Sequence, residues 1–311
     1  MAQIQAKDVA ALRAKTGLGM MDCKKALVEA DGDVEQAIKI LREKGLATAA
    51  KKEGRIAAEG IVDILTEGDV TAIIEVNTET DFVAKNASFR EFVKNVLATI
   101  VANKPGCVDC LMETTLVGSE MTVSQALIEK IAQIGEKISI RRFTVVEGTV
   151  STYIHGAGQT GVIVKFDVAD AVKANEGFAE VAKNIALQIA AGTPPTYVTK
   201  EDVPANVVEE ELAIQVAAAK NDPKLANKPE NVLKNIVAGK MGKLFYEKAC
   251  LVEQAYVKED SLTVGKYLAQ AGKELGGDIK VVSFVLFEKG EGLQKREENF
   301  ADEISKMVNK G

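Results

Sequence analysis

The sequence predicts an α+β protein that contains two copies of one unit. The main observation is an internal repeat: Ala72–Val76 resembles Val162–Phe166 at an offset of 90 (162 − 72), and Phe89–Val96 resembles Phe178–Ile185 at an offset of 89 (178 − 89). The first pair is rich in β-branched residues, which is typical of strands, and the second pair has the apolar spacing of helices. Each unit is therefore predicted to run strand, strand, helix, helix, strand, as a small antiparallel sheet with helices on one face.

The last strands of the two units are separated by more residues than the other repeated segments. Ile138–Glu147 resembles Ile279–Glu288 at an offset of 141 (279 − 138). Since 141 − 89 = 52, the second unit carries about 52 extra residues, which lie within Lys200–Leu262. Two apolar stripes on either side of a proline-containing turn predict a projecting antiparallel helical hairpin of coiled-coil type. The stripes are Val208, Leu212 and Val216, then Leu233, Ile236, Val237, Met241 and Leu244.

The N-terminal segment predicts three short helices that form a small bundle. Gly17 and Gly45 are helix stop signals, and Asp33 with Gln36 resembles a capping box at the start of the third helix. The charged segment Lys51–Arg55 then predicts a linker. The three predicted helices are Lys7–Thr16, Asp22–Ala30 and Asp33–Gly45.

Together these patterns predict five segments along the chain. The C-terminal segment is predicted to hold a loop and one amphipathic helix, with Phe300, Ile304 and Met307 on its apolar face. The expected segments are the N-terminal bundle and linker (1–54), the first unit (55–148), the second unit (149–199 and 263–289), the inserted hairpin (200–262) and the C-terminal module (290–311).

The composition excludes several classes of protein. The formal net charge of −6 argues against a nucleic-acid binder, which usually has a basic surface. Aromatic residues make up only 5% of the chain and Trp is absent, so the cores are expected to be aliphatic. There is no secretory signal pattern, and no apolar run approaches the ~18 residues that span a membrane. We therefore expect a cytoplasmic protein with reduced thiols.

Two motifs have chemical alternatives. Cys107 and Cys110 form a C-x-x-C pair, but a thioredoxin-like site needs a helix that starts at the first Cys in a βαβ unit, and a zinc site needs four ligands. We interpret the pair as incidental and in a loop; the rival hypothesis is a redox enzyme, whose activity Cys110→Ser would abolish. Gly156–Gly161 matches G-x-G-x-x-G, but the strand Val162–Phe166 follows where a dinucleotide site needs a helix, so we predict a hairpin turn. No cofactor, metal or catalytic residue is expected.

The segment Thr80–Asn86 gives the strongest local signal of function. It lies between a strand that ends at Val76 and a helix that begins near Ser88. Ordinarily such a Phe packs into the core and such an Asp caps a turn, although loops carry much function. The corresponding stretch of the second unit, Val168–Val172, has no Phe, which favours an outward-facing role for Phe82. His155, at a predicted strand end, is interpreted as a polar contact residue rather than a general base.

Five motifs resemble the elongation factor Ts family, in order and over essentially the whole chain. The first two are highly specific: residues 12–27 (LRAKTGLGMMDCKKAL) and 80–85 (TDFVAK). The other three are 135–142 (GEKISIRR), 153–156 (YIHG) and 287–292 (FEKGEG). The repeat, the inserted hairpin and the predicted C-terminal helix also resemble the architecture of that family, and the bundle resembles a ubiquitin-associated (UBA) domain in fold only.

The resemblance implies an exchange factor that makes or breaks no covalent bond. Its partner would be elongation factor Tu, in the GDP-bound and the nucleotide-free state, with the nucleotide held by the partner. By family likeness, Phe82 wedges between helices of the partner's G domain and Asp81 perturbs its magnesium site, while Thr80 and Val83 complete the element. Burying one Phe contributes about 1.5–3 kcal/mol, which suits a wedge that discriminates between two states.

The resemblance also implies contacts elsewhere on the chain. Leu12, Met20 and Met21 would contact the partner, and the alternative is that they pack the bundle. His155 and the hairpin would reach other domains of the partner, although the hairpin could serve self-association instead. A rival hypothesis, a chaperone-like module that binds other proteins through the hairpin, predicts no effect on GDP release.

Overall fold

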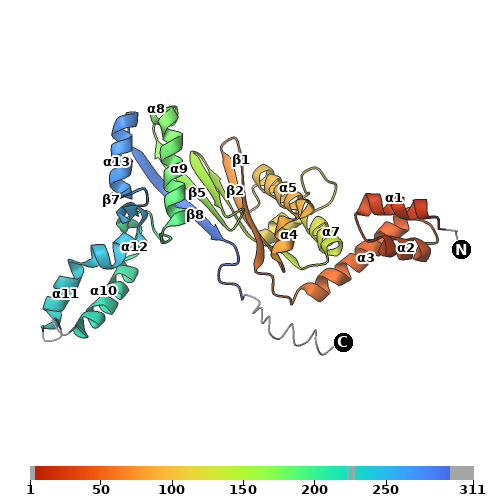
Figure 1. The fold of residues 1–311 in the computed structure, drawn as a ribbon, viewed down its shortest axis with the longest axis horizontal. Coiled ribbons are helices and arrows are strands. Elements are labelled where there is room, and N and C mark those ends of the chain that lie inside the picture. The colour runs from red at the N-terminus through yellow and green to blue at the C-terminus, as the bar shows by residue number, and fades with distance from the viewer. Residues whose placement is uncertain (1–3, 223–224, 226–227, 295–311) are drawn as a thin grey trace.

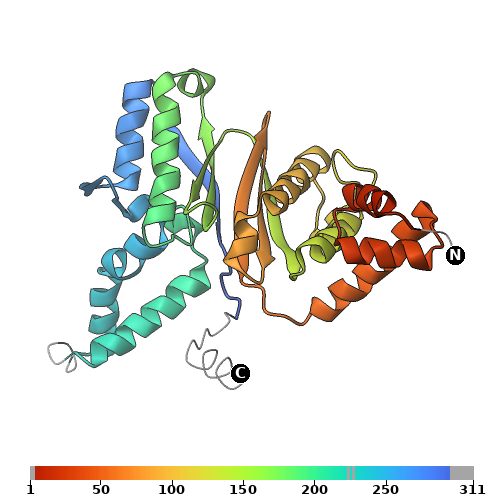
Figure 2. The same ribbon diagram turned by 45° about the vertical axis from the view of Figure 1, so that its right-hand side comes forward.

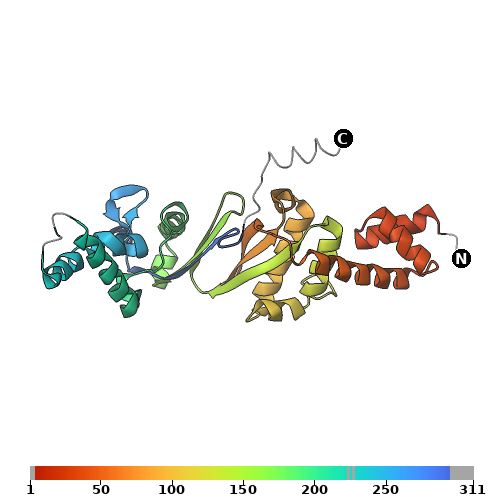
Figure 3. The same ribbon diagram turned by 90° about the horizontal axis from the view of Figure 1, so that it is seen from below.

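The computed structural model describes residues 4–222, 225 and 228–294. It is elongated, with an N-terminal helical bundle at one end and a helical hairpin at the other (Figure 1, Figure 3). Between them lie two three-stranded antiparallel sheets, each with helices packed against it. This arrangement confirms the predicted α+β class.

The bundle consists of α1 (Ala6–Thr16), α2 (Met20–Glu29) and α3 (Val34–Lys52). Gly17 ends α1 with a left-handed φ of 66°, which glycine adopts without steric cost. The Asp33 carboxylate accepts the Gln36 N–H at 3.0 Å and caps α3. The likeness to a UBA domain stays a prediction. The buried core of the bundle is Val9, Leu12, Cys23, Ala26, Leu27, Ala37, Ile40 and Leu41.

The third helix is longer than predicted. We expected it to end at Gly45, with a linker from Lys51, but α3 continues through Gly45 to Lys52. Gly45 is buried where α3 packs against α7 (Val123–Ile134), and a Cβ there would lie at contact distance, 3.4 Å, from Ile128 Cγ2. The buried Lys52 ammonium then donates a hydrogen bond to the Gly135 carbonyl oxygen, which fixes the end of α3 on the first unit.

The first unit is built on a sheet with strand order β1-β2-β3. Its central strand β2 is buried along its whole length, because helices cover one face and the second unit covers part of the other. The elements are β1 (Glu59–Glu67), β2 (Val70–Thr78), α4 (Asp81–Lys85), α5 (Ala87–Asn103), α6 (Val108–Glu113), α7 and β3 (Ile138–Glu147).

The second unit repeats this layout, as the internal repeat predicts. Its sheet has the order β4-β5-β8, and the repeated segments fall in matching strands and helices. Even the irregularity of the central strand recurs: the register shifts after Glu75 in β2 and after Lys165 in β5, at the predicted offset of 90 (165 − 75). The elements are β4 (Val150–His155), β5 (Thr160–Val168), α8 (Asp170–Lys173), α9 (Glu176–Ala191), α13 (Val264–Leu275) and β8 (Ile279–Glu288).

The two sheets lie side by side (Figure 2), and a small apolar cluster joins them. Val62 and Ile73 of the first sheet meet Ile163 and Phe287 of the second. The hairpin between β4 and β5 crosses β1 closely, because a Cβ at Gly161 would lie 2.6 Å from Val62 Cγ1. The glycine-rich motif is therefore a hairpin turn, as predicted, and its glycine at 161 makes room for the neighbouring sheet.

The insertion contains the predicted helical hairpin and a return segment that we did not predict. Helices α10 (Ala205–Lys220) and α11 (Glu230–Ala238) pack through Val216, Leu233 and Val237, and Met241, just after α11, joins the same cluster. The residues that follow are not part of the hairpin, because Leu251 and Tyr256 are buried in the core of the second unit. These remaining elements are η1 (Lys200–Asp202), a π-helical turn η2 (Gly242–Tyr246), α12 (Glu247–Ala249), η3 (Leu251–Glu253), β6 (Ala255–Tyr256) and β7 (Glu259–Thr263).

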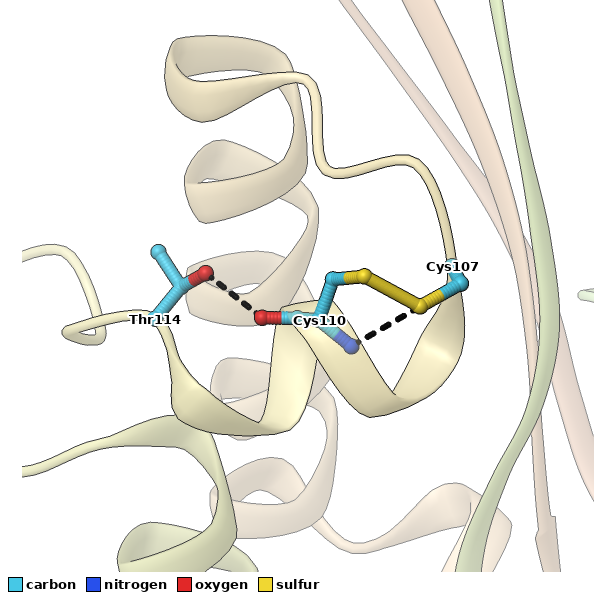
Figure 4. The surroundings of a disulfide bond; sticks show 3 residues. All are labelled: Cys107, Cys110 and Thr114. Carbon is cyan, nitrogen blue, oxygen red and sulfur yellow. Dashed lines mark hydrogen bonds between the residues drawn. A yellow bond between two sulfur atoms is a disulfide. The ribbon is translucent and has the colours of Figure 1, made fainter.

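The C-x-x-C pair differs from the prediction. Cys107 and Cys110 form a disulfide, so the expectation of reduced thiols is wrong for these two residues (Figure 4). They do not lie in a loop either: Cys107 caps α6 and Cys110 lies in its first turn. Because the backbone turns into the helix after Cys107, residues three apart come close, and the two Cα atoms are 5.1 Å apart.

The helix predicted around Phe300, Ile304 and Met307 lies outside the described residues. Among the helices that the structure describes, none combines the length and the apolar character needed to cross a bilayer.

Candidate partner-binding site

The short helix α4 presents the segment that the sequence singled out. It follows the buried strand β2 after a two-residue connection, and Thr80 precedes it with extended backbone. The Glu136 carboxylate accepts two hydrogen bonds from Thr80, from the backbone N–H at 3.0 Å and from the hydroxyl at 2.7 Å. The start of α4 is therefore tied to the loop between α7 and β3.

The inner face of α4 is anchored in the first core. Val83 and Ala84 are buried among the apolar residues of that core. Arg90 of α5 donates from Nε to the Ala84 carbonyl oxygen at 2.9 Å. Val83 thus stabilises the turn from inside and is not exposed for contact with another protein.

The outer face of α4 exposes a large apolar side chain. Phe82 is 79% exposed, which is the greatest exposure of any large apolar side chain in the described part of the chain. The Lys85 ammonium lies 5.9 Å from the centroid of its ring. Single exposed apolar residues are common; this one is an aromatic ring on a turn fixed at both ends, and its burial would contribute about 1.5–3 kcal/mol.

Asp81 places a negative charge beside the exposed ring. Its carboxylate accepts a hydrogen bond from Lys85 at 2.6 Å. That hydrogen bond holds the pKa of Asp81 below its usual value, so the side chain is a carboxylate at neutral pH. The tip of α4 therefore combines one apolar ring with one ion pair.

The N-terminal residues proposed as contacts separate into two groups. Leu12 is only 1% exposed and lies in the core of the bundle, so the packing alternative applies to it and a direct contact is not available in this structure. Met20 and Met21, at the start of α2, are 54% and 60% exposed. These two flexible apolar side chains remain available for another protein.

His155 ends strand β4 and is exposed. Its Nδ1 lies 3.2 Å from the hydroxyl of Tyr153 on the same strand. The turn after His155 is tied to the first unit, because Arg90 donates from Nη2 to the Ala157 carbonyl oxygen at 3.3 Å. Since the same guanidinium also holds Ala84, the turn beside His155 and the α4 helix are positioned by one side chain.

A buried carboxylate connects two of the motifs. Glu75 of β2 is fully buried and pairs with Arg141 at 3.0 Å and Arg142 at 2.7 Å. It also accepts the Gly290 N–H at 2.8 Å. Burial raises the pKa of Glu75, but the hydrogen bonds from Gly290, Asn77, Arg141 and Arg142 outweigh it, so the net shift is downward. The motifs around 135–142 and 287–292 therefore meet at one structural centre.

Sequence reasoning did not assign roles to Glu136 and Arg90, which position the site. Glu136 belongs to a quoted motif, but it lies 56 residues from Thr80 in the chain, and nothing in the sequence pairs the two. Arg90 lies on the exposed side of a predicted helix, where an Arg is ordinary.

Together the fold and the site define an α+β protein that exposes an aromatic ring on a turn held at both ends. A family model described as elongation factor TS matches residues 79–291, which include α4, the arginines that pair with Glu75 and the turn beside His155. The chain is 45% identical to elongation factor Ts of Syntrophotalea carbinolica, over 98% of this chain and 99% of the relative. It is 46% identical to elongation factor Ts of Clostridium kluyveri over the same shares of both chains. The chain belongs to the elongation factor Ts family of translation elongation factors.

Proposed function

We propose that this chain binds elongation factor Tu and promotes the release of its GDP, so that GTP can be loaded. In this role it is an exchange factor in the cytoplasm that forms and breaks no covalent bond, and the nucleotide belongs to the partner. The observation that carries the proposal is the 79% exposure of Phe82 on a turn fixed at both ends. The names of the relatives support the partner, since all are elongation factors Ts.

Exchange of this kind follows from linkage between two ligands of the partner. A factor that binds nucleotide-free elongation factor Tu more tightly than the GDP form must weaken GDP binding by the same ratio. The factor therefore needs contacts that differ between the two states. A wedge that fits only where the GDP site has opened is such a contact.

Phe82 is suited to act as the wedge because α4 needs little rearrangement before it binds. The hydrogen bonds between Thr80 and Glu136 fix the start of α4, and the buried Val83 fixes its inner face. Ordering a flexible side chain or loop on binding costs affinity, and a preformed turn avoids most of that cost. Binding energy from the ring can then be used to open the G domain of the partner.

Asp81 is proposed to disturb the magnesium site of the partner. Its carboxylate lies next to the wedge in the chain and is charged at neutral pH, because Lys85 stabilises the charged form. Once Phe82 is inserted, a carboxylate at this position would compete for the hydrogen-bond partners and water ligands that hold Mg²⁺. Thr80 and Val83 are proposed to hold α4 in place and not to touch the partner themselves.

Contacts at a distance from α4 would hold the partner while GDP leaves. Met20 and Met21 on the bundle and His155 on β4 are proposed for this role, and Leu12 supports the first two from inside. The helical hairpin lies at the opposite end of the molecule from the bundle and would reach another domain of the partner or a second copy of this chain (Figure 3).

The wedge is tested by the release of a fluorescent GDP analogue from a bacterial elongation factor Tu. Phe82→Ala should reduce the acceleration by about tenfold or more, since the lost burial is a large part of the differential affinity. Val257→Ala, which trims another exposed apolar side chain (52% exposed), is the matched control and should leave the acceleration unchanged. Equal effects of the two variants would contradict the role of Phe82.

The magnesium role of Asp81 has its own test. Asp81→Asn should slow exchange in the presence of Mg²⁺, and the defect should disappear when a chelator removes Mg²⁺. The Phe82→Ala defect should persist in the chelator, because the wedge also disturbs the contacts of elongation factor Tu with the guanine base and the phosphates of GDP. A defect of Asp81→Asn that is equally large without Mg²⁺ would assign Asp81 to binding alone.

A further inference from the structure

The exposed disulfide at the start of α6 is not used by any of the surfaces described above. We propose that Cys107 and Cys110 form a reversible dithiol–disulfide couple, which a small or protein-borne dithiol reduces by attack on the sulfur of Cys110. The proposal does not involve elongation factor Tu, so it stands or fails separately from the proposed function.

The accessibility of the four cysteines differs sharply. Cys107 and Cys110 are both exposed, whereas Cys23 and Cys250 are completely buried. Burial also raises the pKa of the Cys250 thiol to about 11, which keeps it in the unreactive protonated form. Thiol chemistry on the folded protein is therefore confined to the C-x-x-C pair.

The hydrogen bonds make the two sulfurs of the disulfide unequal. The backbone N–H of Cys110 donates to Sγ of Cys107 at 3.0 Å (Figure 4). A hydrogen bond to the charged form stabilises a thiolate, and a more stable thiolate leaves faster in thiol–disulfide exchange. Attack is thus directed to Cys110, with Cys107 as the leaving group.

Reduction proceeds in two balanced steps. A thiolate of the dithiol attacks Cys110 Sγ, a mixed disulfide forms, and the Cys107–Cys110 bond breaks to release the Cys107 thiolate. The second thiol of the reductant then attacks the other sulfur of the reductant, which is bonded to Cys110 in the mixed disulfide. This step closes the disulfide of the reductant and releases the Cys110 thiolate. Two electrons pass to the protein, the two protons of the dithiol end on Cys107 and Cys110, and the reductant becomes a disulfide.

The fold around α6 does not depend on the disulfide. Leu111 is fully buried in the first core, and its N–H donates to the Cys107 carbonyl oxygen at 3.0 Å. The Thr114 hydroxyl donates to the Cys110 carbonyl oxygen at 3.0 Å. A disulfide that closes so short a loop constrains the unfolded chain little. The helix therefore persists after reduction, which is what a reversible couple requires.

A metal site explains Cys107 and Cys110 less well than a dithiol–disulfide couple does. Within the part of the chain that the structure describes, no group of three or more His, Cys, Asp or Glu side chains could hold a metal ion. A structural zinc site takes four such ligands.

The couple is tested on the folded, full-length protein in mixtures of reduced and oxidised dithiothreitol. After rapid removal of dithiothreitol, the folded protein is alkylated near neutral pH, and mass spectrometry counts the alkylated thiols at each cysteine. Cys107 and Cys110 should convert fully between disulfide and alkylated thiols, in both directions, without change in the circular dichroism spectrum, while Cys23 and Cys250 stay unmodified. A pair that resists excess reduced dithiothreitol until the chain unfolds, or that stays reduced in excess oxidised dithiothreitol, would overturn the proposal.

The direction of attack is tested with single variants. Cys110→Ser and Cys107→Ser each leave one exposed thiol, which is converted to its mixed disulfide with glutathione and then reduced with dithiothreitol. The backbone N–H at position 110 is present in both variants, so release of Cys107 should be about threefold faster or more than release of Cys110. Equal rates, or faster release of Cys110, would overturn the assignment of Cys107 as the leaving group.

Discussion

Thr80 donates two hydrogen bonds to the Glu136 carboxylate, at 3.0 Å from its N–H and 2.7 Å from its hydroxyl. The pair joins the start of α4 to the loop that leads from α7 into β3. Because Phe82 lies two residues after Thr80, this contact sets the direction in which the exposed ring points.

Glu136→Ala should therefore weaken exchange although Glu136 itself lies behind the proposed contact surface. Loss of the acceptor leaves two donors of Thr80 without a partner and lowers the free energy of unfolding by about 1–3 kcal/mol. The acceleration of GDP release by Glu136→Ala should fall toward that seen with Phe82→Ala. Its affinity for elongation factor Tu should fall further at higher temperature. Glu67→Ala, at the exposed end of β1, is the control and should change neither quantity.

Glu75→Gln should destabilise the protein in a pH-dependent way. The pKa of Glu75 in the folded state lies below 4.5, the ordinary value, so its contribution to stability is complete above about pH 4.5 and is lost as the pH falls through the folded-state pKa. Urea unfolding should show a difference of about 1–3 kcal/mol between wild type and variant at pH 7. That difference should shrink below pH 4.5; a difference that grows with acidity would contradict the ionised centre.

Leu12 and the two methionines should behave in opposite ways. Leu12→Ala leaves a cavity in the bundle and should lower its stability by about 2–5 kcal/mol, seen as faster hydrogen exchange in α1 to α3. The double variant Met20→Ala, Met21→Ala should change stability by less than about 0.5 kcal/mol, since both side chains are exposed. Its affinity for elongation factor Tu should nevertheless fall; unchanged affinity would remove the bundle surface from the interface.

Gly161→Ala should disturb the packing of the two sheets. The new Cβ would lie 2.6 Å from Val62 Cγ1 and 3.0 Å from Ile73 Cδ1, so these side chains must shift. Such overpacking costs about 1–3 kcal/mol, which a thermal melt would detect. Gly54→Ala, at a site outside the left-handed region where nothing lies within 4 Å of the new Cβ, separates this contact from the general effect of replacing a glycine.

The sequence was sufficient to predict the repeat and the hairpin. The spacing of Ala72–Val76 and Val162–Phe166 depends on local patterns, and both segments are central strands in the structure. The continuation of α3 through Gly45 was missed because a glycine at a close helix contact has the same appearance in sequence as a stop signal.

The parts of the site that were missed depend on contacts between distant residues. Thr80 and Glu136 are paired by the fold, as are Arg90 and Ala157. Leu12 and Met20 are both apolar residues of short helices, and only the packing shows that one is buried and the other exposed. The disulfide between Cys107 and Cys110 follows from where α6 begins, and helix boundaries are the least predictable feature of a sequence.

The most direct test of the account is the rate of GDP release from a bacterial elongation factor Tu with and without this chain. The account predicts a strong acceleration that saturates with the concentration of the chain, and an affinity for the partner that GDP lowers by the same factor. Release at the same rate with and without the chain, from a partner that responds to another elongation factor Ts, would contradict it.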